Sequence, residues 1–189
     1  MTMKTLELLQ RRRSNKKLGQ IAPNAEQLQH MFKAALRAPD HGKLKPYHFV
    51  VIEKQSMSML KACLVDAAIE FEMDEKNALK ADKIAEQAPL MIGIVAKIDH
   101  QSEKVPAWEQ MISAGCATYA MQLAANALGF DTVWISNQWV EGKMLRQAFG
   151  CQTGDKIIGL LLVGSPKEAR DGISLARETE NTEGFVSYL

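Results

Sequence analysis

One segment constrains the fold of this chain more than any other. Residues 106–128, PAWEQMISAGCATYAMQLAANAL, form the longest stretch with helical patterning, and Gly129 follows as a typical helix stop. Ala and Met are frequent in it, so apolar residues cover much of the circumference of the predicted helix. A helix of this kind has to be covered on more than one side. We therefore expect residues 106–128 to form a central helix of the fold.

Helical and strand patterns alternate along the rest of the chain. Runs of β-branched and other apolar residues predict strands at residues 48–53, 90–98, 130–136 and 156–166. Amphipathic patterns predict helices at residues 3–13, 24–38, 56–71, 74–87 and 141–149. No linker or internal repeat interrupts the 189 residues. The pattern predicts a single α+β domain, residues 1–189, with a three-layer α/β/α arrangement around one central mixed sheet.

The end of the chain has a different pattern. Residues 167–189 lose periodicity and are polar until FVSYL at residues 185–189, which has the composition of an edge strand. A tail with so little apolar surface of its own is expected to pack on a partner subunit.

Charge and cysteine usage narrow the class of protein. Lys and Arg number 23 against 22 Asp and Glu, a net charge of +1, so no global field favours a polyanion, and neither nucleic acid nor membrane is expected as a partner. The three cysteines are far apart, which does not indicate a disulfide framework. The N-terminus has no secretory signal, and no run of about 18 apolar residues occurs. We expect a cytoplasmic protein.

Familiar catalytic motifs are missing from the sequence. It contains no G-x-G-x-x-G, no P-loop, no G-x-S-x-G and no H-E-x-x-H. The four histidines do not have the spacing of metal ligands, so no metal site is expected.

Two clusters of cations and hydroxyls lie instead at predicted helix ends. Arg12, Arg13 and Ser14 follow the first helix and precede Lys16, whereas Arg37 and His41 follow the second. Such donors on short loops are suited to holding a phosphate. A basic run such as RRRSNKK is also typical of a solvated helix end, and that run alone favours the solvated interpretation. The second cluster, beside a proline-rich turn, strengthens the phosphate-binding interpretation without making it the favoured one.

Four motifs in this order resemble the nitroreductase family of FMN-dependent NAD(P)H oxidoreductases. They are RRRSNKKL, RAPDHGKLKPYHFVVIE, EQMISAGCATYAMQLAANALGFDTVWIS and KIIGLLLVGSP, and together they extend over nearly the whole chain. The Arg-Ala-Pro-Asp-His turn at residues 37–41 is shared with a small branch of that family.

The resemblance implies which residues bind the cofactor. Arg12, Arg13 and Ser14 would contact the phosphate, ribityl and ring-edge atoms of FMN, and Lys16 would lie near N1 and O2 of the flavin, where reduction places negative charge. Contacts from the other subunit of a homodimer are implied for Arg37 and His41, and backbone contacts for Trp134, Ile135 and Ser136. A nicotinamide-binding segment is sometimes assigned to the equivalents of Ala124, Ala125, Asn126, Ala127, Leu128 and Gly129, although packing of an Ala-rich helix end explains them better.

The chain also departs from the family pattern. Lys45, Pro46 and Tyr47 replace Gln-Pro-Trp, and Ile135 stands where we expect an arginine. The C-terminal cation that grips the phosphate in larger relatives has no clear counterpart; Arg170 and Arg177 are candidates. These departures leave the FMN affinity and the substrate open.

The resemblance implies a reaction as well as a cofactor. FMN would pass two electrons from NADH or NADPH to a flat acceptor such as a nitroaromatic or a quinone by a ping-pong mechanism, with no side chain acting as a catalytic residue. Two alternatives remain for this fold: a different flavin chemistry, such as dehalogenation or flavin fragmentation, or a flavin-binding protein with little turnover.

Overall fold

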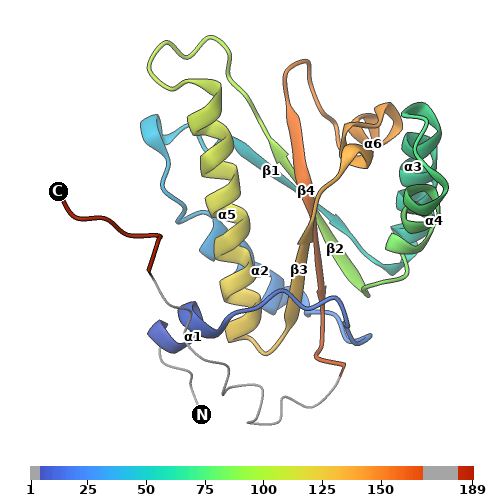
Figure 1. Cartoon of the computed structure of the whole chain (residues 1–189), viewed down its shortest axis with the longest axis horizontal. Helices are drawn as coiled ribbons and strands as arrows, with labels where there is room; N and C mark the ends of the chain where they lie inside the picture. The colour runs from blue at the N-terminus through green and yellow to red at the C-terminus, as the bar shows by residue number, and fades with distance from the viewer. Residues whose placement is uncertain (1–4, 168–182) are drawn as a thin grey trace.

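The computed structural model describes residues 5–167 and 183–189 (Figure 1). Its strands are β1 (Tyr47–Ile52), β2 (Leu90–Ala96), β3 (Asp131–Ile135) and β4 (Lys156–Gly164). Its α-helices are α1 (Thr5–Arg11), α2 (Ala25–Ala35), α3 (Met57–Glu70), α4 (Glu75–Ile84), α5 (Ala107–Ala127) and α6 (Lys143–Ala148). Short 3-10 turns form η1 (His41–Lys43), η2 (Lys54–Ser56) and η3 (Gln138–Glu141). The cation candidates Arg170 and Arg177 lie outside the described residues.

The strands form one sheet in the order β1-β2-β4-β3. Every neighbouring pair is antiparallel, so the predicted α+β class is confirmed, whereas the four described strands do not form the mixed sheet that we expected. The connections explain the difference. The contacting helices α3 and α4 return the chain to the end of the sheet where β1 finished, so β2 runs antiparallel to β1. Helix α5 links β2 to β3, which run in the same direction, but β4 lies between them.

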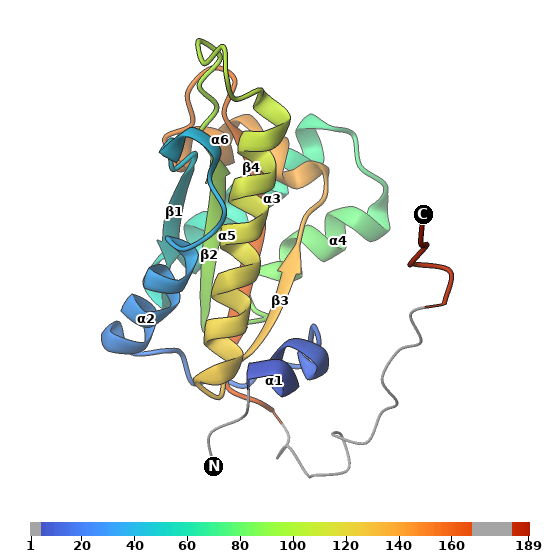
Figure 2. The ribbon, with the colours of Figure 1, turned by 90° about the vertical axis from the view of Figure 1, so that its left-hand side faces the viewer.

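Two helical layers cover the sheet, as Figures 1 and 2 show. Helices α3, α4 and α6 pack on one face around a cluster that includes Leu64, Ile84 and Leu162. Helices α2 and α5 pack on the other face around Met31, Met121 and Leu161. Strand β2 is buried along its whole length because both layers cover it. This confirms the three-layer arrangement.

Local sequence signals account for the helix ends. The side chain of Asn24 accepts a hydrogen bond from the N–H of Gln27, and the Gln27 side chain accepts one from the N–H of Asn24, so a complete capping box begins α2. At the C-terminal end of α5, Gly129 has a φ of 90° and allows a tight reversal of the chain. There the N–H of Phe130 donates to the carbonyl of Ala125, as in a Schellman motif.

The outer face of α5 is left open by this packing. One helical stripe combines Trp108, Met111, Ile112 and Tyr119, of which Trp108 is 61% and Ile112 57% exposed. The side of α5 that faces the sheet therefore confirms the prediction of a central helix, whereas its outer side is exposed. Among the residues that the structure describes, no helix has the length and apolarity needed to cross a bilayer.

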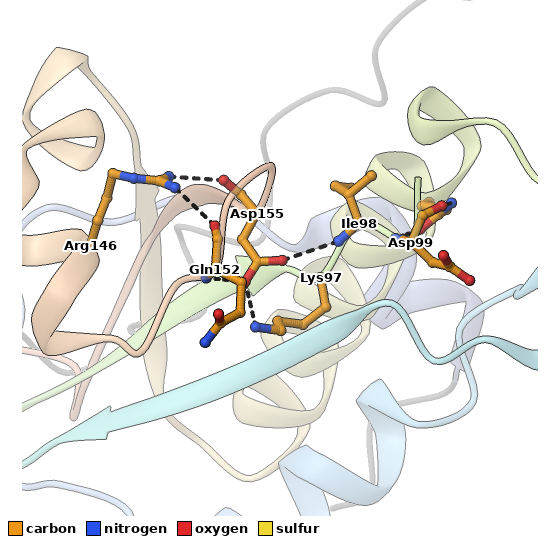
Figure 3. Close-up of polar contacts among 7 residues, drawn as sticks. Lys97, Ile98, Asp99, Arg146, Gln152 and Asp155 are labelled. Atoms are coloured by element: carbon orange, nitrogen blue, oxygen red, sulfur yellow. Dashed lines mark hydrogen bonds and ion pairs between the residues drawn. The ribbon is translucent and has the colours of Figure 1, made fainter. Parts of the chain in front are cut away.

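A buried carboxylate fixes the turn between α6 and β4 (Figure 3). Asp155 is almost completely buried, forms an ion pair with Lys97 and accepts hydrogen bonds from the N–H groups of Gln152 and Ile98. Arg146 adds a hydrogen bond from Nη1 to the Asp155 carbonyl at 2.8 Å. Burial alone would raise the pKa of Asp155, but the hydrogen bonds from Lys97 and Gln152 outweigh it and the pKa is lowered.

Because the pKa of Asp155 is lowered on folding, its carboxylate stabilises the fold above the ordinary carboxyl pKa of about 3.9 and loses that contribution as the pH falls through the folded value. We expect Asp155→Asn to lower the free energy of unfolding by about 1–3 kcal/mol at neutral pH. The difference from the wild type should shrink below about pH 4. Urea unfolding at both pH values measures this.

The matched control is Asp82→Asn, which removes a half-exposed carboxylate that pairs with Lys61 at 3.0 Å. It should cost less than about 1 kcal/mol. Equal losses in the two variants would contradict the role given to Asp155.

Candidate functional site

The loop after α1 is tied to the edge strand of the sheet. The N–H of Asn15 donates to the carbonyl of Thr132 at 2.9 Å, and Asn15 Nδ2 donates to Asp131 Oδ2 at 2.8 Å. The chain at Leu18 then forms a bridge with Pro166, beyond the end of β4. These contacts hold the first predicted cluster of donors beside β3.

Arg12 is the residue of this cluster that turns inward. Its N–H continues α1 by donating to the carbonyl of Leu8, and its guanidinium carbon lies 5.7 Å from the centre of the Tyr119 ring of α5. The Nε and Nη1 atoms are buried and have no hydrogen-bond partner among the described residues. Buried guanidinium donors normally have partners, so this position suits an anionic ligand. Arg13, Ser14 and Lys16, on the same loop, are exposed.

The second part of the site is the end of β3. Trp134 and Ile135 are half-buried, and Ser136 is exposed. The indole Nε1 of Trp134 donates to the carbonyl of Ile158 at 3.2 Å. Gly159 makes this arrangement possible, because a Cβ there would lie only 2.2 Å from Trp134 Nε1. The orientation of Trp134 thus depends on a glycine of the neighbouring strand.

An open groove of about 490 Å³ continues from the end of β3. Ser136 and Met111 of α5 line it, together with Glu141 and Lys156, which form an ion pair at 3.6 Å. The volume is in the range of small-molecule pockets. The groove therefore offers room for a planar ligand next to the predicted cofactor contacts.

Helix α5 brings the loop after α1 and β3 together. Tyr119 contacts Arg12, and a Cβ on Gly115 would lie 3.8 Å from the Trp134 ring. Residues four apart lie on the same helix face, so both contacts belong to one face of α5. The loop that carries Arg12 and the strand that carries Trp134 are more than 100 residues apart in sequence, and both contact this helix.

The second cluster of donors follows α2, and the loop between α2 and β1 reaches the first turn of α5 (Figures 1 and 2). Arg37 is exposed just after α2, and His41 is exposed in η1. His41 Nδ1 lies 2.8 Å from Glu109 Oε2 in the first turn of α5. Ten residues separate Glu109 from Tyr119, or roughly 15 Å along the helix. Within one chain, the structure does not bring His41 to Arg12.

The sequence Lys45-Pro46-Tyr47, which departs from the family pattern, places the ring of Tyr47 at the start of β1. Tyr47 is buried and stacks on Phe49, with ring centres 5.4 Å apart. Burial, and then the charge of Asp40, raises the pKa of the Tyr47 hydroxyl. Its ring therefore belongs to the core of the α2 and α5 layer, and it remains a neutral phenol at physiological pH.

The end of α5 is fully accounted for by packing. Ala125 and Asn126 are buried, and Asn126 Nδ2 donates to the carbonyl of Phe130 at 2.8 Å. With Gly129 as the stop, these contacts complete the helix end. The nicotinamide assignment of residues 124–129 stays a prediction that this geometry does not require.

Three residues of the site were not predicted from the sequence. They are Asn15, which lies within the basic run, and Glu109 and Tyr119, which lie within the long helical segment. An asparagine within a cationic run is the one local signal that suggests a structural anchor, because Asn often hydrogen-bonds backbone groups in loops.

The architecture recurs in a solved structure. The nitroreductase with bound FMN from Bacteroides fragilis superposes with a TM-score of 0.72 at 20% identity, covering 98% of this chain and 98% of that chain. The sheet with its two helical layers is therefore a nitroreductase-like fold.

Sequence comparison extends the likeness beyond the fold. The model of the nitroreductase family matches residues 9–165. A Haemophilus influenzae protein named "Putative NAD(P)H nitroreductase" is 53% identical over 99% of this chain and 100% of its own length. The Escherichia coli protein "Putative NAD(P)H nitroreductase YdjA" is 46% identical over 99% of this chain and 100% of its own length. The chain belongs to the nitroreductase family.

Proposed function

We propose that this protein is an FMN-dependent oxidoreductase that transfers two electrons from NADH or NADPH to nitroaromatic or quinone-like acceptors by a ping-pong mechanism. The observation that carries the proposal is the guanidinium of Arg12, with two buried nitrogens that lack partners in the described chain. A phosphate monoester supplies the charge and the acceptor oxygens that such a group needs. The names of the relatives and the FMN in the Bacteroides structure support this identification of the ligand.

The site residues would divide the work of binding. Arg12 would hold the phosphate, and the exposed Arg13 and Ser14 can close over it from the same loop. Lys16 would place a cation near the flavin ring, and the chain at residues 134–136 would run along its edge. Bound FMN supplies the redox chemistry, so the protein's part is orientation, electrostatics and exclusion of water. The groove beyond Ser136 would admit the planar acceptor.

A homodimer would complete the site. The stripe on α5 is apolar, exposed and centred near Gly115, whose lack of a side chain permits close helix packing. In a two-fold contact, residue i of one chain meets residue j of the other and the reverse. Antiparallel packing of two α5 helices about an axis near Gly115 would set the Glu109 turn beside Tyr119 of the other chain. His41 of one subunit would then approach the Arg12 site of the other.

The end of the chain fits the same assembly. Strand β3 is an edge of the described sheet, and beyond the contact of Asn15 with Thr132 such an edge is suited to pairing with another chain. Phe185, Val186, Tyr188 and Leu189 are all exposed. Packing of residues 167–189 on a partner subunit would cover these apolar side chains.

The decisive experiment is purification followed by a spectrum. We expect a yellow protein with flavin absorbance that NADH or NADPH bleaches and that a quinone or nitroaromatic compound restores. Yellow protein that neither nucleotide reduces would indicate a flavin-binding protein, and a flavin reduced without turnover of these acceptors would favour another chemistry. Colourless protein that takes up no added FMN would reject the proposal.

Arg12→Ala should weaken FMN binding by about tenfold or more, because a charge-assisted hydrogen bond is worth roughly 1.5–3 kcal/mol. Fluorescence quenching of FMN titrated with protein measures the dissociation constant. The control is Arg11→Ala, which removes an exposed arginine that pairs with Glu7 at 2.6 Å on α1. The assignment of Arg12 is contradicted if both variants bind FMN like the wild type.

Ile112→Glu should produce a monomer that binds FMN weakly, because a carboxylate in the middle of a helix pair cannot be buried without a partner. Sedimentation velocity measures the association, and an FMN titration measures the coupled loss. Ile69→Glu is the control, since Ile69 is 74% exposed on α3, in the other helical layer. A dimer that survives Ile112→Glu would place the interface elsewhere.

A further inference from the structure

The proposed dimer alone does not explain the contact between His41 and Glu109. His41 Nδ1 and Glu109 Oε2 are 2.8 Å apart, although the residues are 68 positions apart in sequence. The His41 side chain is 61% exposed and that of Glu109 is 29% exposed. Exposed ion pairs contribute little to stability, so the contact is poorly explained as a device that holds the fold together.

Other contacts already fix the backbone of the turn that carries His41. The carboxylate of Asp40 accepts hydrogen bonds from the N–H of Leu44 at 3.2 Å and of Lys45 at 2.8 Å. Gly42 has a φ of 75° and packs closely on Val105, since a Cβ there would lie 3.0 Å from that side chain. The path of the turn therefore does not depend on Glu109. What Glu109 determines is the direction of the imidazole ring.

Glu109 is itself held in place. Its N–H donates to the carbonyl of Pro106 at 3.0 Å, in the first turn of α5. The next residue, Gln110, is completely buried and donates through Nε2 to the carbonyls of Asp99 and Val105. The loop before α5 and the start of the helix are thus one connected unit, which gives Glu109 a fixed backbone from which to orient another side chain.

We propose that Glu109 is a positioning residue that orients His41 toward the FMN bound by the partner subunit. This inference rests on the proposed function. An ionised carboxylate can only accept hydrogen bonds, so Nδ1 of His41 must donate to it. Nε2 is then the ring nitrogen left for a ligand, as in other sites where a carboxylate fixes one nitrogen of a histidine and presents the other. Without Glu109 the exposed ring would sample several rotamers and lose affinity for the cofactor.

The test is a double-mutant cycle read out by FMN binding to the whole protein. FMN fluorescence quenching gives dissociation constants for the wild type, Glu109→Ala, His41→Ala and the double variant. We expect each single variant to weaken binding by about five- to tenfold, a loss typical of one charge-assisted contact or its orientation. The double variant should bind within about twofold of His41→Ala, because Glu109 acts only through that side chain.

Two further variants separate positioning from charge and from folding. Glu109→Gln keeps a carbonyl oxygen that can accept from Nδ1, so it should recover most of the affinity that Glu109→Ala loses. Glu103→Ala removes an exposed carboxylate from the loop before α5 and should bind FMN like the wild type. Apo-protein melting temperatures should agree within a few degrees among all these variants.

The outcomes distinguish this inference from the proposed function. If the wild type and His41→Ala behave as expected but Glu109→Ala binds FMN normally, the positioning role is overturned and the proposed function stands. A loss from Glu109→Ala that is equally large in the His41→Ala background would also overturn it, because the effect would not pass through His41. Failure of the wild type to bind FMN would overturn both proposals.

Discussion

The structure depends on helix α5, whose outer face stays exposed in the described part of the chain. Helix α5 packs one face on the sheet through Ala114, Ala117 and Met121, all completely buried. Its opposite face keeps Trp108, Ile112 and Tyr119 exposed. Such a face is costly in water, yet α5 also provides the contacts of Tyr119 with Arg12 and of Glu109 with His41. The same helix thus supplies the core, the proposed interface and the support for the proposed cofactor contacts.

Much of the fold could be predicted because its signals are local. The capping box at Asn24 and Gln27 and the glycine stop at Gly129 lie within a few residues of the helix ends that they define. Sheet direction is not local in this sense. Alternating helices and strands are typical of parallel units, but a pair of helices between β1 and β2 reverses the chain before the next strand begins. Nothing in the separate patterns of α3 and α4 states that they pack as a pair.

In the candidate site too, local signals could be read from the sequence and long-range contacts could not. Residue type and order placed Arg12, His41 and Trp134 in it, largely through a family resemblance. Their partners Tyr119, Glu109 and Gly159 could not be found, because each contact joins residues between 25 and 107 positions apart in the printed sequence. In addition, a tyrosine in an apolar helix, a glutamate in a first helical turn and a glycine in a strand have ordinary structural explanations. The tertiary fold decides which residue each of them contacts.

The described part of the chain is incomplete in two ways, and a different bound partner would remedy each. The buried donors of Arg12 have no acceptor among the described residues, and buried donors without acceptors cost roughly 1–3 kcal/mol because they have lost water and gained no partner. The exposed apolar face of α5 leaves a hydrophobic contribution unrealised. An anion at Arg12 would remove the first deficit and a second chain on α5 the second. Since Tyr119 belongs to both surfaces, ordering either one fixes a residue that the other needs. Ligand binding and association should therefore be thermodynamically linked, with each raising the stability of the other.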